Sequence, residues 1–278
     1  MSPYQYLPIH PALKELVVLI GVMHIDFSSS PISSVYRFPW MNNTHLFFPL
    51  KEDPLWVKSG EEQTFRSYSS AYFVGPKLVN DTVDFGRERH VVGITFKPGA
   101  FQRLMGIPGK EVMNVDVDAT YIFGNGLRET EMRLKEAAGN EEILAIVEDF
   151  LFKKIKLMSR ETPFDHAINE LLRSNGNLTV ETFASYACKS IRQLERQSVE
   201  KLGMSPRLFG RLIRFGSAFS TKEMQPDLNW TSIAYRTGYY DQMHLIKDFK
   251  TFIGATPKEL NLSSDSSVKM MAALYGMY

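Results

Sequence analysis

Two stretches of the chain carry one pattern of residues twice: ASYACKSIRQLERQSVEKLGMSP, residues 184–206, and AYRTGYYDQMHLIKDFKTFIGATP, residues 234–257. A shift of 51 positions places Ser190 on Asp241 and keeps the later landmarks aligned, whereas upstream of the turn the shift is 50. A turn that differs by one residue explains the two shifts. Repeats of this length indicate duplicated supersecondary units. The predicted unit is a helix, a tight turn and a second helix.

In the first copy, two helices are predicted on either side of a turn near Cys188. Ser190 is a good N-cap for the second helix, and Gln193 three residues later completes a capping-box pattern. Gly203 suits the C-terminal end of that helix. The positions expected to face inward are Val180, Phe183, Ala184 and Ala187 in the first helix and Ile191, Leu194, Val199 and Leu202 in the second.

The second copy follows the same plan, with its turn at Gly238, an N-cap at Asp241 and a closing Gly254. Alanine in both leading helices fits the close contact between helices that a tight corner demands. The predicted inward-facing residues are Ile233 and Ala234 in the leading helix and Leu245, Phe249 and Phe252 in the next.

The outward faces of the two second helices carry the polar residues that remain once the apolar positions are assigned. A helix that presents Arg, Gln and Lys on one side can enter a major groove and hydrogen-bond base edges. For one helix a solvated face is the commoner interpretation, but two copies with matching caps favour DNA. The candidates are Arg192, Gln193, Glu195, Arg196 and Gln197 in the first copy, and Gln242, Met243, Lys247 and Lys250 in the second.

The two copies, with their Gly203-Met-Ser-Pro206 and Gly254-Ala-Thr-Pro257 endings, closely resemble the DNA-binding domain of AraC/XylS-type transcription regulators. The resemblance implies two helix-turn-helix units joined by a long helix, here Pro206 to about Thr221. Their recognition helices would cover about 190–202 and 241–253 and bind double-stranded promoter DNA. RNA polymerase and a second copy of the chain are further expected partners. The implied base-facing positions are Arg192, Glu195 and Arg196, then Gln242, Met243, Ile246 and Lys247.

One position departs from the pattern of the family. Ser198 stands where the family commonly has an aromatic core residue and where the second copy has Phe249. The departure puts the packing of the first unit in question, but it leaves the predicted fold in place.

The distribution of charge agrees with a DNA-binding C-terminal half. Residues 1–159 carry 17 Lys and Arg against 19 Asp and Glu, whereas residues 160–278 carry 15 against 12. The excess is mild, so we expect modest, salt-sensitive non-specific DNA binding. The single cysteine excludes an internal disulfide. The apolar run Leu16 to Ile25 is too short to span a bilayer, so a cytoplasmic protein without a membrane segment is expected.

The first half of the chain is aromatic-rich and favours strands, which makes the predicted fold class α+β. Short strand candidates punctuated by Pro and Gly suggest a small barrel or sandwich, and the family implies a cupin-like sensing or oligomerisation domain. The expected domains are residues 1–159, the DNA-binding region 160–262 and a flexible tail, 263–278. The strand candidates are residues 35–40, 45–50, 55–58, 64–74 and 90–96, with a helix expected at 10–20.

Helices are expected to complete the first domain at residues 100–105, 121–138 and 141–158, with a loop at 106–118. The last helix has an apolar stripe that fits either packing against the strands or a dimer interface. Its members are Ile143, Ile146, Val147, Phe150, Leu151 and Ile155.

The residues leave the role of the first domain open between a sensing domain and other possibilities. Its aromatic residues could line an effector pocket, although a core role is commoner for Tyr36, Phe38, Trp40, Phe47, Phe48 and Trp56. His24, His45 and His90 stand far apart in the sequence, so neither a catalytic metal nor another cofactor is expected. The preferred function is a sequence-specific transcription regulator with a small-molecule effector, and not an enzyme. The alternative is an effector-binding module whose helical domain contacts a protein instead of DNA.

Overall fold

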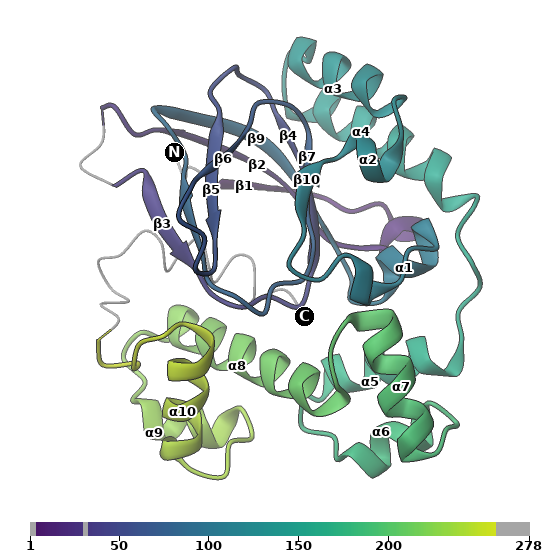
Figure 1. Ribbon diagram of the computed structural model, residues 1–278, viewed down its shortest axis with the longest axis vertical. Helices are drawn as coiled ribbons and strands as arrows, with labels where there is room; N and C mark the ends of the chain where they lie inside the picture. The colour runs from purple at the N-terminus through teal and green to yellow at the C-terminus, as the bar shows by residue number, and fades with distance from the viewer. Residues whose placement is uncertain (1–3, 30–32, 260–278) are drawn as a thin grey trace.

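The computed structural model describes residues 4–29 and 33–259, which fold into an N-terminal domain of strands and helices and a C-terminal domain of helices (Figure 1). The expected flexible tail lies outside the described residues. In the described part of the chain, no helix is long and apolar enough to cross a membrane.

Six antiparallel strands form the larger sheet of the N-terminal domain in the spatial order β1-β2-β9-β4-β7-β10. Along β9, Val92, Ile94 and Phe96 point to the helices, whereas Val91 and Gly93 face the second sheet. The middle of this sheet is therefore buried on both faces. Its strands are Tyr4–Leu7 (β1), Val17–Asp26 (β2), Thr44–Pro49 (β4), Tyr72–Val74 (β7), Glu88–Phe96 (β9) and Asp116–Asp118 (β10).

Four antiparallel strands form the smaller sheet, in the order β3-β8-β5-β6. They are Val35–Phe38 (β3), Leu55–Ser59 (β5), Arg66–Tyr68 (β6) and Asp81–Asp84 (β8). Met23, Tyr36, Val57, Tyr72 and Phe85 form part of the apolar cluster between the two sheets. The domain is thus the expected β-rich fold, with one sheet facing the other.

Helices cover the outer face of the larger sheet. The apolar stripe of α4 packs there: Phe150 meets Phe48 of β4 with ring centroids 6.1 Å apart, and Phe123 at 5.7 Å. Of the two interpretations of this stripe, packing against the strands is correct. The elements are η1 (Pro11–Leu13), α1 (Ala100–Met105), η2 (Gly109–Glu111), α2 (Thr120–Phe123), α3 (Leu127–Glu136) and α4 (Asn140–Ile155).

Six helices form the described part of the C-terminal domain, residues 163–259, with the long helix α8 running between two smaller groups (Figure 1). Phe209, Phe215 and Phe219 of α8 are buried in a core that continues into both groups. The helices are α5 (Pro163–Arg173), α6 (Val180–Tyr186), α7 (Ile191–Leu202), α8 (Pro206–Met224), α9 (Trp230–Arg236) and α10 (Gln242–Phe252).

Four sequence-based expectations about the N-terminal domain are wrong. Residues 10–20, expected to be a helix, form the short η1 and the start of β2. A strand buried on both faces has a continuous apolar run, which sequence periodicity cannot distinguish from a buried helix. Residues 64–74 are two strands in different sheets. The helix expected over 121–138 breaks at Gly124, whose φ of 82° ends α2. Residues 106–118, expected to be a loop, contain η2 and β10. The helix expected at residues 100–105 is confirmed as α1.

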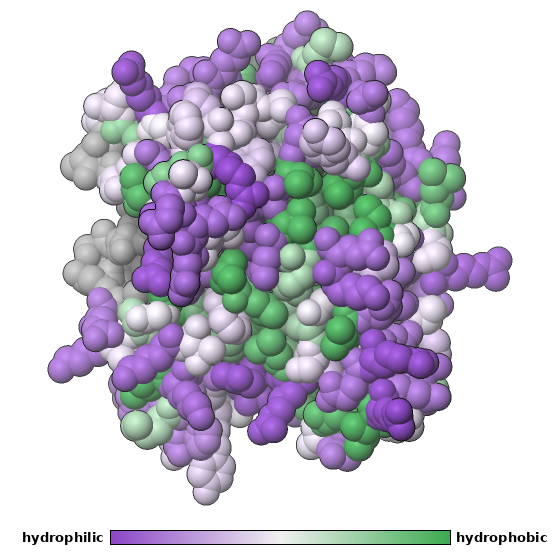
Figure 2. All heavy atoms as spheres, in the orientation of Figure 1, coloured by the Kyte–Doolittle hydropathy of each residue, from purple (hydrophilic) through white to green (hydrophobic). Residues whose placement is uncertain are grey.

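The boundary between the two domains is apolar. Met41 belongs to the core of the C-terminal domain, and Phe38, Trp40, Val74 and Met113 pack against that core from the N-terminal side. Hydrophobic residues gather over β10 and α2 and again along this boundary on the visible face (Figure 2). The two domains therefore share a packed interface.

Candidate nucleic-acid interface

The two helix-turn-helix corners have the same backbone geometry, although their turn residues differ. Cys188 adopts a positive φ of 51° where Gly238 has 79°. The amide after each turn bonds back to the leading helix, from Lys189 to the Ala184 carbonyl at 3.0 Å and from Tyr239 to the Ala234 carbonyl at 2.9 Å. The repeat seen in the sequence is therefore a repeat of structure.

Each recognition helix begins at the predicted cap. The Ser190 hydroxyl accepts from the Gln193 amide at 3.3 Å, and the Gln193 side chain accepts from the Ser190 amide at 3.0 Å. In the second unit, Asp241 Oδ1 accepts from the His244 amide at 2.8 Å, and these bonds to the carboxylate lower the pKa of Asp241. Both caps satisfy backbone donors that would otherwise be unpaired at a helix start.

The outward faces of α7 and α10 are exposed at equivalent positions after the 51-residue shift. Arg192, Arg196 and Val199 are exposed on α7, and their counterparts Met243, Lys247 and Lys250 are exposed on α10. Each face thus carries two cations and one apolar side chain. Val199 is 43% exposed and Ile191 is 45% exposed, so placing them in the core was wrong.

The remaining candidates lie beside these faces instead of at their centres. Glu195 and Ile246 are equivalent positions and are half-buried. The Gln193 carbonyl oxygen is used by the cap, and the Gln242 carbonyl oxygen accepts from the Thr231 hydroxyl at 2.8 Å. Both glutamines keep an amide nitrogen for which no bond within the described residues is recorded.

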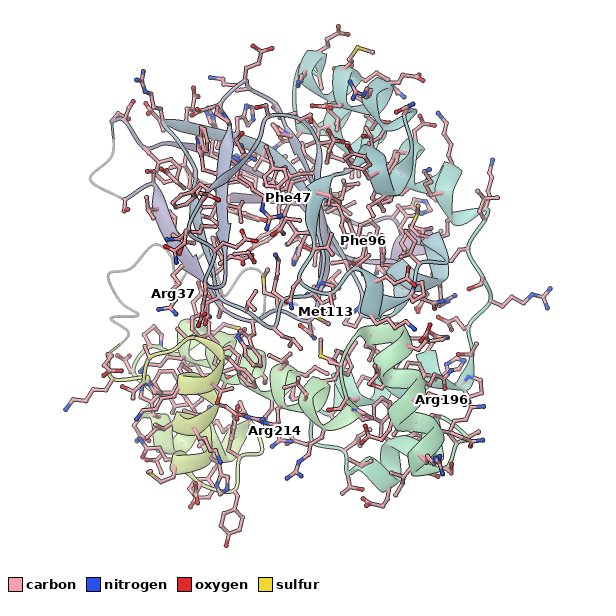
Figure 3. The ribbon with its side chains drawn as sticks, in the orientation of Figure 1. Arg37, Phe47, Phe96, Met113, Arg196 and Arg214 are labelled. Carbon is pink, nitrogen blue, oxygen red and sulfur yellow. The ribbon has the colours of Figure 1, made fainter. Side chains whose placement is uncertain are left out.

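The two units are tied together at their corners. Asn177 Nδ2, between α5 and α6, donates to the Thr237 carbonyl at 3.3 Å, and an added Cβ on Gly238 would collide with that asparagine. Arg214 of α8 donates to the Gly176 carbonyl at 2.9 Å from its place between the units (Figure 3). These bonds link the two units to each other and to α8, and Arg214 has a structural role that the sequence did not reveal.

The position of Ser198 resolves the question raised by the sequence. Ser198 is fully buried, and its hydroxyl donates to the Met204 carbonyl at 2.7 Å. Its counterpart Phe249 is also fully buried and meets Phe215 and Trp230 at 4.9 and 5.0 Å between ring centroids. The first unit replaces aromatic packing at this position by a hydrogen bond.

The N-terminal domain contacts the C-terminal end of the first recognition helix. A Cβ on Gly109 of η2 would lie 2.1 Å from the Lys201 carbonyl oxygen, so only glycine allows this approach. Lys110 pairs with Glu200 at 2.8 Å on the exposed rim of the contact. Arg196 lies on α7 beside a groove that Gln102 of α1 also lines (Figure 3).

The N-terminal domain also contacts the end of the second recognition helix. The carbonyl of Phe252, the last residue of α10, accepts from the Trp40 amide at 3.1 Å and from Asn80 Nδ2 at 2.8 Å. The rings of Trp40 and Phe252 lie 5.3 Å apart. Both recognition helices are therefore held at their C-terminal ends by one domain.

A cavity of about 80 Å³ lies between the sheets of that domain. Glycines leave room for its aromatic walls, since a Cβ on Gly21 would lie 2.9 Å from the Tyr4 ring and one on Gly93 would lie 3.0 Å from the Phe47 ring. Phe47 lies between the two sheets (Figure 3). Of the aromatic residues considered from the sequence, Phe38 and Phe47 line the cavity.

The other four aromatic candidates lie elsewhere. Tyr36 and Phe48 are buried in the cores on either side of the larger sheet, Trp40 contacts α10, and Trp56 is 41% exposed. The sequence therefore found the aromatic character of this domain but could not separate cavity from core.

Polar side chains line one part of the cavity. Asp81 and Asp116 face it, and both bond to Lys77, which is fully buried. His45 also lines it; burial lowers the pKa of His45 to about 4, so this histidine is neutral at pH 7. Sequence spacing gave no sign of the Lys77 cluster, because Asp116 lies 35 residues or more from Lys77 and Asp81 in the chain.

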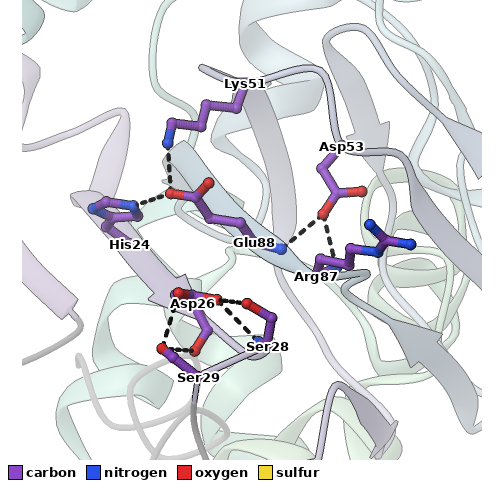
Figure 4. A network of polar contacts seen from close by, with 8 residues as sticks. All are labelled: His24, Asp26, Ser28, Ser29, Lys51, Asp53, Arg87 and Glu88. Atoms are coloured by element: carbon purple, nitrogen blue, oxygen red, sulfur yellow. Dashed lines mark hydrogen bonds and ion pairs between the residues drawn. The ribbon is translucent and has the colours of Figure 1, made fainter.

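Two of the scattered histidines are neighbours in space. His24 and His90 pair across β2 and β9 with rings stacked 4.4 Å apart, and His24 Nε2 bonds to Glu88 at 2.6 Å (Figure 4). Asp53 accepts from the Glu88 amide at 2.7 Å in the same network. Within residues 4–29 and 33–259, no three His, Cys, Asp or Glu side chains are placed to hold a metal ion.

Comparison with known proteins agrees with this geometry. Residues 183–262 match a family model described as a helix-turn-helix domain. A search of curated proteins gives no match. A structure of ToxT from Vibrio cholerae is 14% identical, with a TM-score of 0.50 over 93% of this chain and 97% of ToxT. Wild-type ToxT with a bound unsaturated fatty acid is 14% identical, with a TM-score of 0.51 over 87% and 93%.

Residues 183–262 are therefore a helix-turn-helix domain, and its paired units have the arrangement found in AraC-type regulators. The chain as a whole has the fold of ToxT, an AraC family regulator: a β-rich domain followed by paired helix-turn-helix units.

Proposed function

We propose that α7 and α10 read two successive major-groove segments of promoter DNA, and that a small molecule in the N-terminal cavity controls this. The observation that carries the proposal is the match between the two outward faces: exposure repeats at three equivalent positions of two capped helices, with a cation at the central position of both, Arg196 and Lys247. A solvated face has no reason to repeat in this way.

The chemistry of each face assigns roles to its residues. Arg192 and Arg196 can hydrogen-bond guanine edges, and Val199 can contact a thymine methyl group. On α10, Lys247 takes the place of Arg196 and Met243 the place of Arg192, while Lys250 follows one turn later. The proposed flanking contacts to bases and phosphates come from Gln193, Glu195, Gln242 and Ile246.

The cavity and the docking surface share residues, which supports control by a ligand. Phe38, Met41 and Val74 line the cavity and also pack against the core of the C-terminal domain. Trp40, next to Met41 in the chain, donates to the last residue of α10. A molecule that fills the cavity moves these shared side chains, and so biases how the recognition helices are held.

The bound fatty acid in ToxT supports a small-molecule effector for this fold. Because the proposed target is promoter DNA, the protein would act in the cytoplasm. Its proposed functional partner is RNA polymerase. Because the α4 stripe is used inside the domain, a homodimer would need another surface. We assign the chain no catalytic activity, which elemental analysis of the purified protein tests by looking for a bound metal.

Selection of DNA from a random library by the full-length chain tests the proposal. We expect enrichment of two short elements about one helical turn apart, because two linked recognition helices meet one side of the duplex. The Arg196→Ala variant should lose preference in one element only. Arg173→Ala, which removes an exposed arginine from α5, is the matched control and should leave the site unchanged.

The alternative function, protein contact through the helical domain, makes a different prediction. Phosphate contacts release counterions, so DNA binding should fall steeply between about 50 and 200 mM salt. No enriched site and salt-independent association with a protein would contradict the DNA-reading proposal.

A further inference from the structure

We propose that the cavity between the two sheets binds a small apolar amine, whose ammonium group pairs with the Asp116 carboxylate next to aromatic walls. This inference rests on the proposed effector site and goes further, because it specifies the charge of the ligand. It is carried by the charges, contacts and shape of the cavity.

The charges next to the cavity do not balance. Asp81 and Asp116 both face it, and the ammonium group of Lys77 lies between the two carboxylates. All three side chains are at least nine-tenths buried. One buried cation therefore faces two buried anions, and a buried charge without a partner is costly. A cationic ligand supplies the missing charge.

Of the two carboxylates, Asp116 has an oxygen that is free to accept a hydrogen bond. Asp81 accepts from Ser59 at 2.6 Å through one oxygen and from Lys77 at 3.0 Å through the other. Asp116 accepts only from Lys77, through Oδ2, so within the described residues its Oδ1 has no donor. His45 Nε2, in another wall of the cavity, is also buried without a partner. An ammonium group donates to a free carboxylate oxygen such as Asp116 Oδ1.

The walls suit the rest of such a molecule. The Tyr68 hydroxyl donates to the Asp116 backbone carbonyl at 2.9 Å, which places this ring beside the carboxylate. Tyr68, Tyr72 and Phe47 follow one another with ring centroids 5.6 and 5.0 Å apart. Aromatic faces attract cations and cover apolar groups.

An anionic ligand does not fit this end of the cavity. A carboxylate placed beside Asp116 would add a third negative charge next to the single Lys77. Arg89 is a second buried cation of the domain, but it bonds to the Tyr72 hydroxyl at 3.1 Å and is not among the residues that line the cavity. The expected ligand thus differs in charge from the fatty acid bound to ToxT.

Binding of an amine should depend on pH in one direction. Burial raises the pKa of Asp116 to about 6, although Lys77 opposes this. Below that pH the carboxyl takes up a proton and loses its attraction for a cation, so amine binding should weaken as the pH falls from 7 to 5. The other titratable or charged groups around it are Lys77, Asp81, Arg66, Tyr68 and His45.

The experiment compares three probes of nearly equal size on the full-length protein: benzylamine, benzyl alcohol and phenylacetate. Binding is measured by calorimetry and by ligand-detected NMR, without DNA. We expect benzylamine to bind at least about tenfold tighter than benzyl alcohol, the size of one charge-assisted hydrogen bond. Phenylacetate should bind weakest.

Two variants locate the effect. Asp116→Asn keeps the shape and leaves Lys77 balanced by Asp81, so the protein should fold and the preference for benzylamine should disappear. Glu61→Gln removes the same charge from an exposed loop and should change nothing. Equal loss of benzylamine binding in both variants would reduce the effect to net charge and overturn the proposal.

The outcomes separate this inference from the proposed effector site. If benzyl alcohol or phenylacetate bound the cavity more tightly than benzylamine, the preference for an amine would be wrong and the proposed effector site would stand. Tightest binding of phenylacetate would indicate Arg89 as the group that holds the ligand. Lack of binding by all three probes to the wild-type protein would count against both proposals.

Discussion

The two helix-turn-helix units reach one backbone geometry by different chemistry. At equivalent core positions the first unit has the hydroxyl of Ser198, bonded to a carbonyl, and the second has the ring of Phe249, packed against two other rings. At equivalent turn positions the first has Cys188 and the second Gly238. The fold therefore constrains the backbone of the unit more tightly than its side chains.

The units also differ in how the N-terminal domain holds them. The first is held by a backbone contact at Gly109 that tolerates no side chain, and the second by the ring of Trp40 and two hydrogen bonds to Phe252. Trp40 is next to Met41, which lines the cavity. The second unit is thus the one more directly connected to the cavity.

The largest expected effect is a difference in stability between variants at the equivalent core positions 249 and 198. Phe249→Ala should lower the free energy of unfolding by about 3–5 kcal/mol, because it leaves a cavity among aromatic rings. Ser198→Ala should cost only about 1–3 kcal/mol, the penalty for leaving the Met204 carbonyl buried without a donor. Chemical denaturation of both variants measures the difference. Equal costs would mean that the two positions are not the distinct solutions described above.

The next largest effect distinguishes the two contacts by which the N-terminal domain holds α7 and α10. Gly109→Ala should cost roughly 1–3 kcal/mol through the clash with the Lys201 carbonyl, and should raise hydrogen exchange at the end of α7. Asn80→Ala removes one of the two bonds to the Phe252 carbonyl and should cost about 1 kcal/mol, with faster exchange at the end of α10.

Each docking variant controls for the other in this experiment. If either substitution loosened both helices to the same extent, the domain would be docked as one rigid unit, and the distinction between the two contacts would fail.

The C-terminal half could be predicted from the sequence in detail because its signals are local. Caps at Ser190 and Asp241, and glycines at the helix ends, act within a few residues, and duplication allowed each copy to check the other. Val199 was misplaced because a helix end offers apolar residues on more than one side. Only the structure shows that it is exposed, one turn after Arg196 on the same face of α7.

The N-terminal half could be predicted only as a class, because its structure depends on pairing between distant segments. The start of strand β2 was taken for the end of a helix at residues 10–20, since burial on both faces removes the alternation of apolar and polar residues. The Lys77 cluster joins residues 77, 81 and 116, and sequence spacing carries no signal for such a site. His24 and His90 meet for the same reason, across two paired strands.

A smaller effect separates the two DNA-reading faces. Arg196→Ala should reduce discrimination at one base pair by about 1–3 kcal/mol, because Arg bonds guanine through two nitrogens. Lys247→Ala at the equivalent position should weaken binding to all sequences alike, since Lys more often acts as a point charge. Binding to a panel of single-base variants of the selected site measures both. If Arg196→Ala weakened every sequence equally, Arg196 would contact phosphate instead.

The smallest expected effect concerns the two turns. A left-handed residue with a side chain costs about 1–2 kcal/mol, and glycine avoids this at some cost in entropy, so Cys188→Gly should stabilise the protein by about 0.5–1 kcal/mol. Cys188→Ser keeps the side chain and the strain, and should leave stability nearly unchanged. Thermal unfolding of the two variants distinguishes backbone strain from loss of the thiol. If serine stabilised as much as glycine, the thiol itself would be unfavourable, and the turns would differ in chemistry and not in strain.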